Sequence, residues 1–165
     1  MKPLLTKPFL DYLTKVKTNN KTLLEIGSGN STVFFENIFR KVISLEDNQI
    51  WYDKVFKKCK KADLIMFDQK NIYPTLNDCL NRRPHYILID NDPTNISRLD
   101  LAEFVHLNKD YGSMIILDNG EKNLEAYSLL KSNYYCLDFV GQRYDKKTSV
   151  TSLFFGEKLA KKVYV

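Results

Sequence analysis

The stretch Thr22–Glu46 reads TLLEIGSGNSTVFFENIFRKVISLE. An apolar run leads into a turn bracketed by Gly27 and Gly29, and a second apolar run ends at Glu46, nineteen residues after Gly27. This order is typical of nucleoside sites, because glycines let the backbone approach the ligand and the acid can accept both ribose hydroxyls. The stretch therefore predicts a nucleoside-binding α/β domain.

The rest of the chain continues the alternation of strands and helices. Short apolar runs predict strands, and apolar residues three or four positions apart predict helices. Strands are expected at 23–26, 42–45, 64–67, 86–89, 114–117, 134–140 and 149–155. Helices are expected at 9–16, after a cap at Ser31 or Thr32, after a cap at Asn48, at 95–107 and at 122–131. We expect 71–84 to be irregular, with at most one helical turn near 75–80.

Short connections between alternating elements predict a doubly wound α/β fold with helices on both faces. The loop between the last two strands is too short for a crossover helix, so these strands should be antiparallel. The result is a mostly parallel, seven-stranded sheet with an antiparallel closing strand. A chain of 165 residues suits one domain, 1–165, in which 1–18 form an N-terminal helical extension.

Composition and charge restrict the function classes. The net charge of +5 and the pI near 9.0 permit an anionic partner such as nucleic acid, but the lysines are scattered and fit solvated surfaces better. Three widely spaced cysteines lack zinc-ligand spacing and suit reduced thiols. The N-terminus does not resemble a signal peptide, and no apolar run approaches the ~20 residues of a membrane span. We expect a cytoplasmic protein.

Four acids each end a predicted strand: Glu46, Asp68, Asp90 and Asp118. In open α/β sheets, ligands bind at the carboxyl ends of the strands, so these side chains mark the expected site. Thr32 stands where a dinucleotide fingerprint has its third glycine, and the chain has no GK[ST] phosphate loop. A cofactor without phosphates therefore fits better than a dinucleotide.

Five segments resemble the class I methyltransferases that use S-adenosylmethionine. They are LLEIGSGNST (23–32), VISLED (42–47), YILIDND (86–92), YGSMIILDN (111–119) and TSVTSLFF (148–155), in the order found in that family. The resemblance extends over most of the chain. It implies a Rossmann-like fold, S-adenosylmethionine as cofactor, and methylation of an oxygen or nitrogen on an unidentified acceptor, either a small molecule or a macromolecule.

The resemblance also implies roles for individual residues in cofactor binding. Around the methionine part and the backbone side of the cofactor it places Glu25, Gly27, Ser28 and Gly29. Glu46 would accept hydrogen bonds from the ribose, Asp47 would border the adenine, and Asp68 would face the adenine amino group. Asp90 would lie near the reactive methyl group. For Asp68, a turn-forming role is an alternative.

For catalysis, Asp90 is the first candidate to orient or deprotonate the acceptor, and Asp92 is the second. Asp90, Asp118 and Asn119 also match the three positions that hold magnesium in metal-dependent small-molecule O-methyltransferases. Oxygen ligands suit Mg²⁺, which would position a substrate hydroxyl and lower its pKa. Pro93 stands where those enzymes have a lysine, and Asp118–Asn119 has an alternative role as a helix cap.

Other interpretations remain open at this stage. One is a dinucleotide-dependent oxidoreductase, which Thr32 disfavours. Another is a non-catalytic nucleoside- or nucleic-acid-binding module that keeps the fold without the reaction. Trp51 is expected to anchor its helix in the core, with stacking on adenine as the alternative.

Overall fold

Continuous apolar runs form the centre of the sheet. In the computed structural model, which describes residues 3–68, 70–92, 95–110 and 112–157, the strands at 22–26 and 86–89 are buried along their whole length. Burial on both faces is what a strand between two helical layers requires. The strands are β1 (Thr22–Ile26), β2 (Lys41–Glu46), β3 (Asp63–Met66), β4 (Tyr86–Ile89), β5 (Met114–Asp118), β6 (Tyr135–Gln142) and β7 (Thr148–Phe155).

The seven strands form one sheet in the order β3-β2-β1-β4-β5-β7-β6. β1 to β5 are parallel, while β7 is antiparallel to both of its neighbours, β5 and β6. This confirms the predicted doubly wound sheet with an antiparallel closing strand. The chain steps from β1 to β2 on one side and to β4 on the other, which makes the carboxyl end of β1 the switch point of the topology.

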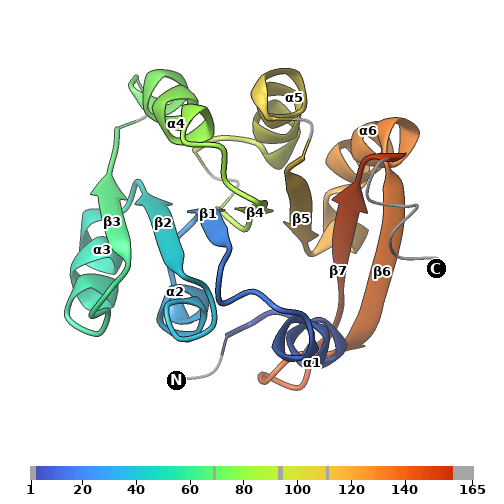
Figure 1. Ribbon diagram of the computed structural model, residues 1–165, viewed down its shortest axis with the longest axis horizontal. Helices are drawn as coiled ribbons and strands as arrows, with labels where there is room; N and C mark the ends of the chain where they lie inside the picture. The colour runs from blue at the N-terminus through green and yellow to red at the C-terminus, as the bar shows by residue number, and fades with distance from the viewer. Residues whose placement is uncertain (1–2, 69, 93–94, 111, 158–165) are drawn as a thin grey trace.

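Helices cover both faces of the sheet, α1 to α3 on one and α4 to α6 on the other (Figure 1). Two buried apolar clusters fill the two interfaces, and alternate residues of the central strands point into one or the other. The helices are α1 (Lys7–Lys15), α2 (Asn30–Phe35), α3 (Gln49–Phe56), α4 (Ile72–Asn81), α5 (Arg98–Asn108) and α6 (Leu124–Asn133), with a 3₁₀ turn, η1 (Gly120–Lys122), before α6.

Two expectations about helices were wrong. The segment expected to be irregular contains the ten-residue helix α4. Its buried residues Ile72, Leu76, Cys79 and Leu80 follow a helical period, and Pro74 sits in the first turn, where its missing N–H has no helical partner to lose. α2 begins before Ser31, because Gly29 is its N-cap residue and Thr32 is the third residue of the helix.

The N-terminal segment packs onto the β6–β7 hairpin. The Thr6 N–H donates to Thr151 Oγ1 at 3.2 Å, and the Thr6 hydroxyl donates to the Phe139 carbonyl at 3.0 Å. A Cβ on Gly141 would lie 2.6 Å from Pro8 Cδ, so glycine permits this close contact. The expected N-terminal extension thus contains helix α1, and it brings Leu4 to the edge of the sheet where the central strands end.

The longest of the described helices, α5, has 11 residues, and none of the described helices is long and apolar enough to cross a membrane.

Candidate functional site: a cleft at the carboxyl ends of β1, β2 and β4

A cleft of about 930 Å³ opens where β1, β2 and β4 end. This is the switch point of the sheet, where open α/β folds bind ligands. Its wall comes from the turn after β1, the loop after β2 with the start of α3, and the segment between β4 and α5. The residues that line it are Leu4, Gly27, Ser28, Gly29, Asn30, Ser31, Glu46, Asp47, Asn48, Ile50, Trp51, Lys54, Asp90, Asn91, Asp92, Asn95 and Arg98.

Gly27 joins the two sides of the cleft. Its φ of +97° is a conformation that side chains rarely adopt. A Cβ at this position would also lie 2.6 Å from the Asp90 carbonyl oxygen and 2.6 Å from Asn91 Cα. The turn after β1 therefore presses directly on the backbone that follows β4, and only glycine fits there. Gly29 has extended backbone and room for a Cβ, with its nearest contact at 3.5 Å.

Glu25 lies beneath the glycine turn rather than in the cleft. It is fully buried, and its Oε2 accepts hydrogen bonds from Thr32 Oγ1 at 2.5 Å and Ser44 Oγ at 2.7 Å. Oε1 is buried without a partner among the described residues, and burial raises the pKa of Glu25 to about 7. Thr32 also accepts the Gly29 N–H at 2.9 Å, so the residue in place of the third glycine links the turn to Glu25.

Glu46 ends β2 and is held against the same turn. Its Oε2 accepts from the Ser28 N–H at 2.9 Å and from the Ser28 hydroxyl at 2.8 Å, and its Oε1 accepts from the Asn48 N–H at 3.0 Å. Burial raises the pKa of Glu46, and these hydrogen bonds oppose that rise. A carboxylate has about four acceptor positions, so three neutral donors leave room for a further one.

The loop after β2 forms the outer wall of the cleft. Asp47 Oδ2 accepts from Asn95 Nδ2 at 2.8 Å, which links this loop to the segment after β4. The Trp51 indole N–H donates to the Ser28 carbonyl at 2.5 Å, and the side chain lines the cleft with 40% of its surface exposed. The expectation that Trp51 anchors α3 in the core was therefore wrong. As predicted, the Asn48 side chain caps α3, by accepting from the Trp51 N–H.

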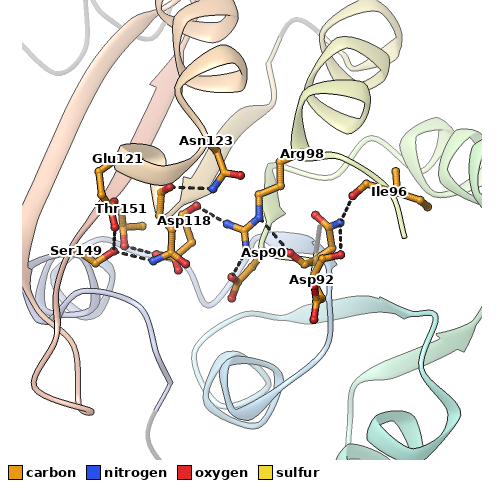
Figure 2. Close-up of polar contacts among 11 residues, drawn as sticks. Asp90, Asp92, Ile96, Arg98, Asp118, Glu121, Asn123, Ser149 and Thr151 are labelled. Carbon is orange, nitrogen blue, oxygen red and sulfur yellow. Dashed lines mark hydrogen bonds and ion pairs between the residues drawn. The ribbon is translucent and has the colours of Figure 1, made fainter. Parts of the chain in front are cut away.

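Asp90 and Asp92 follow β4 and line the other side of the cleft. Figure 2 shows the guanidinium of Arg98 lying between Asp90 and Asp118. Arg98 Nη2 is 3.2 Å from Asp90 Oδ1, and Arg98 is only 7% exposed. Burial raises the pKa of Asp90 to about 6, and the adjacent guanidinium opposes that rise. Asp90 is thus a half-buried carboxylate with a cationic partner.

Each of the three residues of the predicted magnesium site, Asp90, Asp118 and Asn119, has a protein partner, and the site itself stays a prediction. The Arg98 guanidinium donates hydrogen bonds to the Asp90 carboxylate and to the Asp118 backbone carbonyl (Figure 2). Asp118 is 1% exposed and accepts from Thr151 Oγ1 at 2.7 Å, while the Asn119 amide donates to Ser149 Oγ at 2.7 Å. Among the described residues, no group of three or more His, Cys, Asp or Glu side chains could hold a metal. Pro93 lies outside the described residues.

Asp68 is also placed differently from the expected adenine contact. It follows β3, outside the cleft, and its Oδ1 accepts from the Lys70 N–H at 2.8 Å and the Asn71 N–H at 3.0 Å. These are the hydrogen bonds of a turn that leads into α4. The structure therefore supports the alternative, turn-forming role of Asp68.

Arg98 lines the cleft but was not predicted from the sequence as a site residue. A signal was present, because Arg98, Leu101, Ala102 and Val105 are spaced on one helical face and are all buried. A cation in the first turn of a helix is also unusual, since the helix dipole favours an acid there. A charged residue that continues an apolar stripe at that position indicates a buried anionic partner.

Solved structures of several methyltransferases have a similar fold. An O-methyltransferase from Bacillus cereus, solved in complex with SAH, has a TM-score of 0.67 and 17% identity, over 91% of this chain and 80% of that one. An rRNA methylase from Streptococcus thermophilus has a TM-score of 0.62 and 14% identity, over 94% and 100%. The Bacillus subtilis tRNA methyltransferase TrmK has a TM-score of 0.59 and 15% identity, over 96% and 70%.

No protein-family model matches the chain, and no curated protein matches it in sequence. At identities of 14–17%, the three structural similarities show that this chain has the Rossmann-like fold of those methyltransferases.

Proposed function

We propose that this chain is a class I methyltransferase that binds S-adenosylmethionine in the cleft at the ends of β1, β2 and β4. The observation that carries the proposal is the position of Glu46. Its buried carboxylate lines the cleft beside the glycine turn and has hydrogen bonds from three neutral donors. A neutral set of donors leaves the negative charge available to ribose hydroxyls. Two solved structures with a similar fold, an O-methyltransferase from Bacillus cereus and a methyltransferase from Streptococcus mutans, contain SAH.

We infer one orientation of the cofactor in the cleft from the side chains that line it. The ribose would bind Glu46, and the adenine would lie between Asp47 and Trp51, on the outer wall. The methionine part would lie along the turn at Gly27 and Ser28, where the backbone comes closest to the ligand. The methyl group would then point toward Asp90. Glu25 would act from beneath the turn, through Thr32, and not by direct contact.

When it is bound, S-adenosylmethionine supplies a sulfonium that is already an activated leaving group. The chain then has to align the acceptor with the methyl carbon and exclude water. Asp90 lies where it can accept a hydrogen bond from an acceptor O–H or N–H, and Asp92 lines the same side of the cleft. The acceptor is a hydroxyl or amine of a small molecule or a macromolecule. Leu4 brings the N-terminal segment to the cleft, on the side from which an acceptor would enter.

Calorimetry with SAH (S-adenosylhomocysteine) tests the proposal. The wild-type chain should bind SAH, and Glu46→Ala should weaken binding by about 1–3 kcal/mol, the scale of a lost hydrogen bond to a charged group. Asp68→Ala is the matched control, because it removes another acid at the end of a strand, outside the cleft, and should leave the affinity unchanged.

Two results would contradict the proposal. One is the absence of SAH binding at high micromolar ligand. The other is tighter binding of NAD than of SAH, which would favour the dinucleotide-dependent oxidoreductase. Salt-sensitive binding of RNA without binding of SAH would instead indicate the non-catalytic module.

A further inference from the structure

Arg98 is held at the end of the cleft by a set of hydrogen bonds that fixes its orientation. Nε donates to the Asn91 carbonyl at 3.1 Å, Nη2 donates to the same carbonyl at 2.9 Å and to Asp90 Oδ1 at 3.2 Å, and Nη1 donates to the Asp118 carbonyl. All three guanidinium nitrogens have acceptors. A planar cation bound on every edge has one orientation, so Arg98 is a rigid part of the wall.

The charges around Arg98 match those that a metal would need. The guanidinium contacts the half-buried Asp90 carboxylate and the backbone carbonyl oxygens of Asn91 and Asp118, and the carboxylate of Asp118 is buried nearby. Carboxylate and carbonyl oxygens are the usual ligands of Mg²⁺. A resident positive charge repels a divalent cation and already occupies these oxygens. The same oxygens cannot bind both the guanidinium and a divalent cation.

We propose that Arg98 takes the place of the divalent cation at this end of the cleft, so that the chain transfers the methyl group without a metal. The inference rests on the proposed function. In the reaction, the bond from sulfur to the methyl carbon breaks and the bond from that carbon to the acceptor forms. Sulfur keeps the electron pair, and the acceptor proton passes to Asp90 or to water. Arg98 is a positioning residue, which holds the Asp90 carboxylate toward the cleft.

The first test is a titration of the wild-type chain with Mn²⁺, followed by the electron paramagnetic resonance signal of the free ion, with saturating SAH present. We expect no bound Mn²⁺ up to about 1 mM. Because linkage is reciprocal, the SAH dissociation constant should also agree within about twofold in EDTA and in excess Mg²⁺. Mn²⁺ binding at about 100 µM or tighter that Asp90→Asn abolishes would overturn the proposal.

The second test compares two ligands of the same cleft, SAH and sinefungin. Sinefungin has a protonated amine in place of the methyl sulfonium, so it places a positive charge near Asp90. Arg98→Met should raise the affinity for sinefungin relative to SAH by about tenfold, because a cation has been removed from that end. Arg98→Lys keeps the charge and should leave the ratio near that of the wild type. A purely structural role would weaken both ligands equally.

The outcomes separate the two proposals. If neither ligand binds the wild-type chain, the proposed function fails. If both bind and the ratio is the same in Arg98→Met and wild type, the role of Arg98 is wrong while the function stands. The Mn²⁺ titration needs no variant of Arg98, so it decides the question of the metal even if Arg98→Met does not fold.

Discussion

The two carboxylates that line the cleft, on Glu46 and Asp90, are stabilised in different ways. Glu46 accepts hydrogen bonds from neutral donors on Ser28 and Asn48, whereas Asp90 pairs with the buried guanidinium of Arg98. The end of the cleft at Glu46, where we propose that the ribose binds (the ribose end), therefore keeps a negative charge for ligand hydroxyls. At the end at Asp90, where we propose that the reaction occurs (the reaction end), the carboxylate charge is balanced within the protein.

Replacing Gly27 should have the largest effect, because Gly27 packs against the backbone of Asp90 and Asn91 and so joins the two ends of the cleft. Gly27→Ala adds a Cβ at a φ of +97° and 2.6 Å from the backbone of Asp90 and Asn91. We expect a loss of about 3–5 kcal/mol in the free energy of unfolding, from strain and displaced backbone together. Urea denaturation measures it. Gly29→Ala is the control and should cost less than about 1 kcal/mol. Equal losses in the two variants would contradict this account of the turn.

Glu25 is linked to both ends of the cleft. It lies beneath the glycine turn and, in addition to burial, its charge raises the pKa of Asp90. The pKa of Glu25, about 7 in the folded chain, exceeds its ordinary value of 4.5. Between these pH values the folded chain holds a proton that the unfolded chain has lost. The contribution of Glu25 to stability therefore falls as pH rises from about 4.5 to about 7, by about 3 kcal/mol.

Glu25→Gln removes this titration while keeping a similar shape. In unfolding experiments from pH 4.5 to 8, the free energy of unfolding of the variant should rise relative to that of the wild type by about 3 kcal/mol. The difference between the two proteins isolates Glu25 from the other acids with raised pKa values. A constant difference across this pH range would show that Glu25 stays in one charge state.

Ser28→Ala should have the smallest effect, at the ribose end. It removes the hydroxyl that donates to Glu46 Oε2 at 2.8 Å and leaves the Ser28 N–H in place. A ribose hydroxyl can take up the vacated position, so SAH affinity should change by less than about threefold. Calorimetry compares the variant with Glu46→Ala. If the two variants lose equal affinity, the Ser28 hydroxyl itself binds the ligand.

The sequence predicted the surroundings of Glu46 better than those of Asp90, for a physical reason. Glu46 and the glycine turn are recognised from local patterns, since a strand, a glycine turn and a strand-ending acid need no knowledge of distant contacts. The partner of Asp90 is on a helix, and its role depends on how α5 packs against the sheet. A periodic pattern shows that position 98 faces inward, but not which carboxylate it meets.

The acids at the ends of the strands show the same limit. Asp68 and Asp118 end strands as Glu46 and Asp90 do, so the sequence treats all four alike. Their surroundings differ, because Asp68 bonds to its own turn and Asp118 is buried against β7. The sequence predicted that the last two strands, β6 and β7, pair antiparallel. The contact of Thr151 with Asp118 depends on the insertion of β7 between β5 and β6, which the sequence did not predict.

A crystal structure of the chain with SAH would show directly whether the ribose of the ligand binds Glu46. We expect a ribose hydroxyl at about 2.6–3.2 Å from the Glu46 carboxylate, with the sulfur end of the ligand toward Asp90 and Arg98. Density for the adenosyl group at another site, or with its ribose away from Glu46, would contradict it.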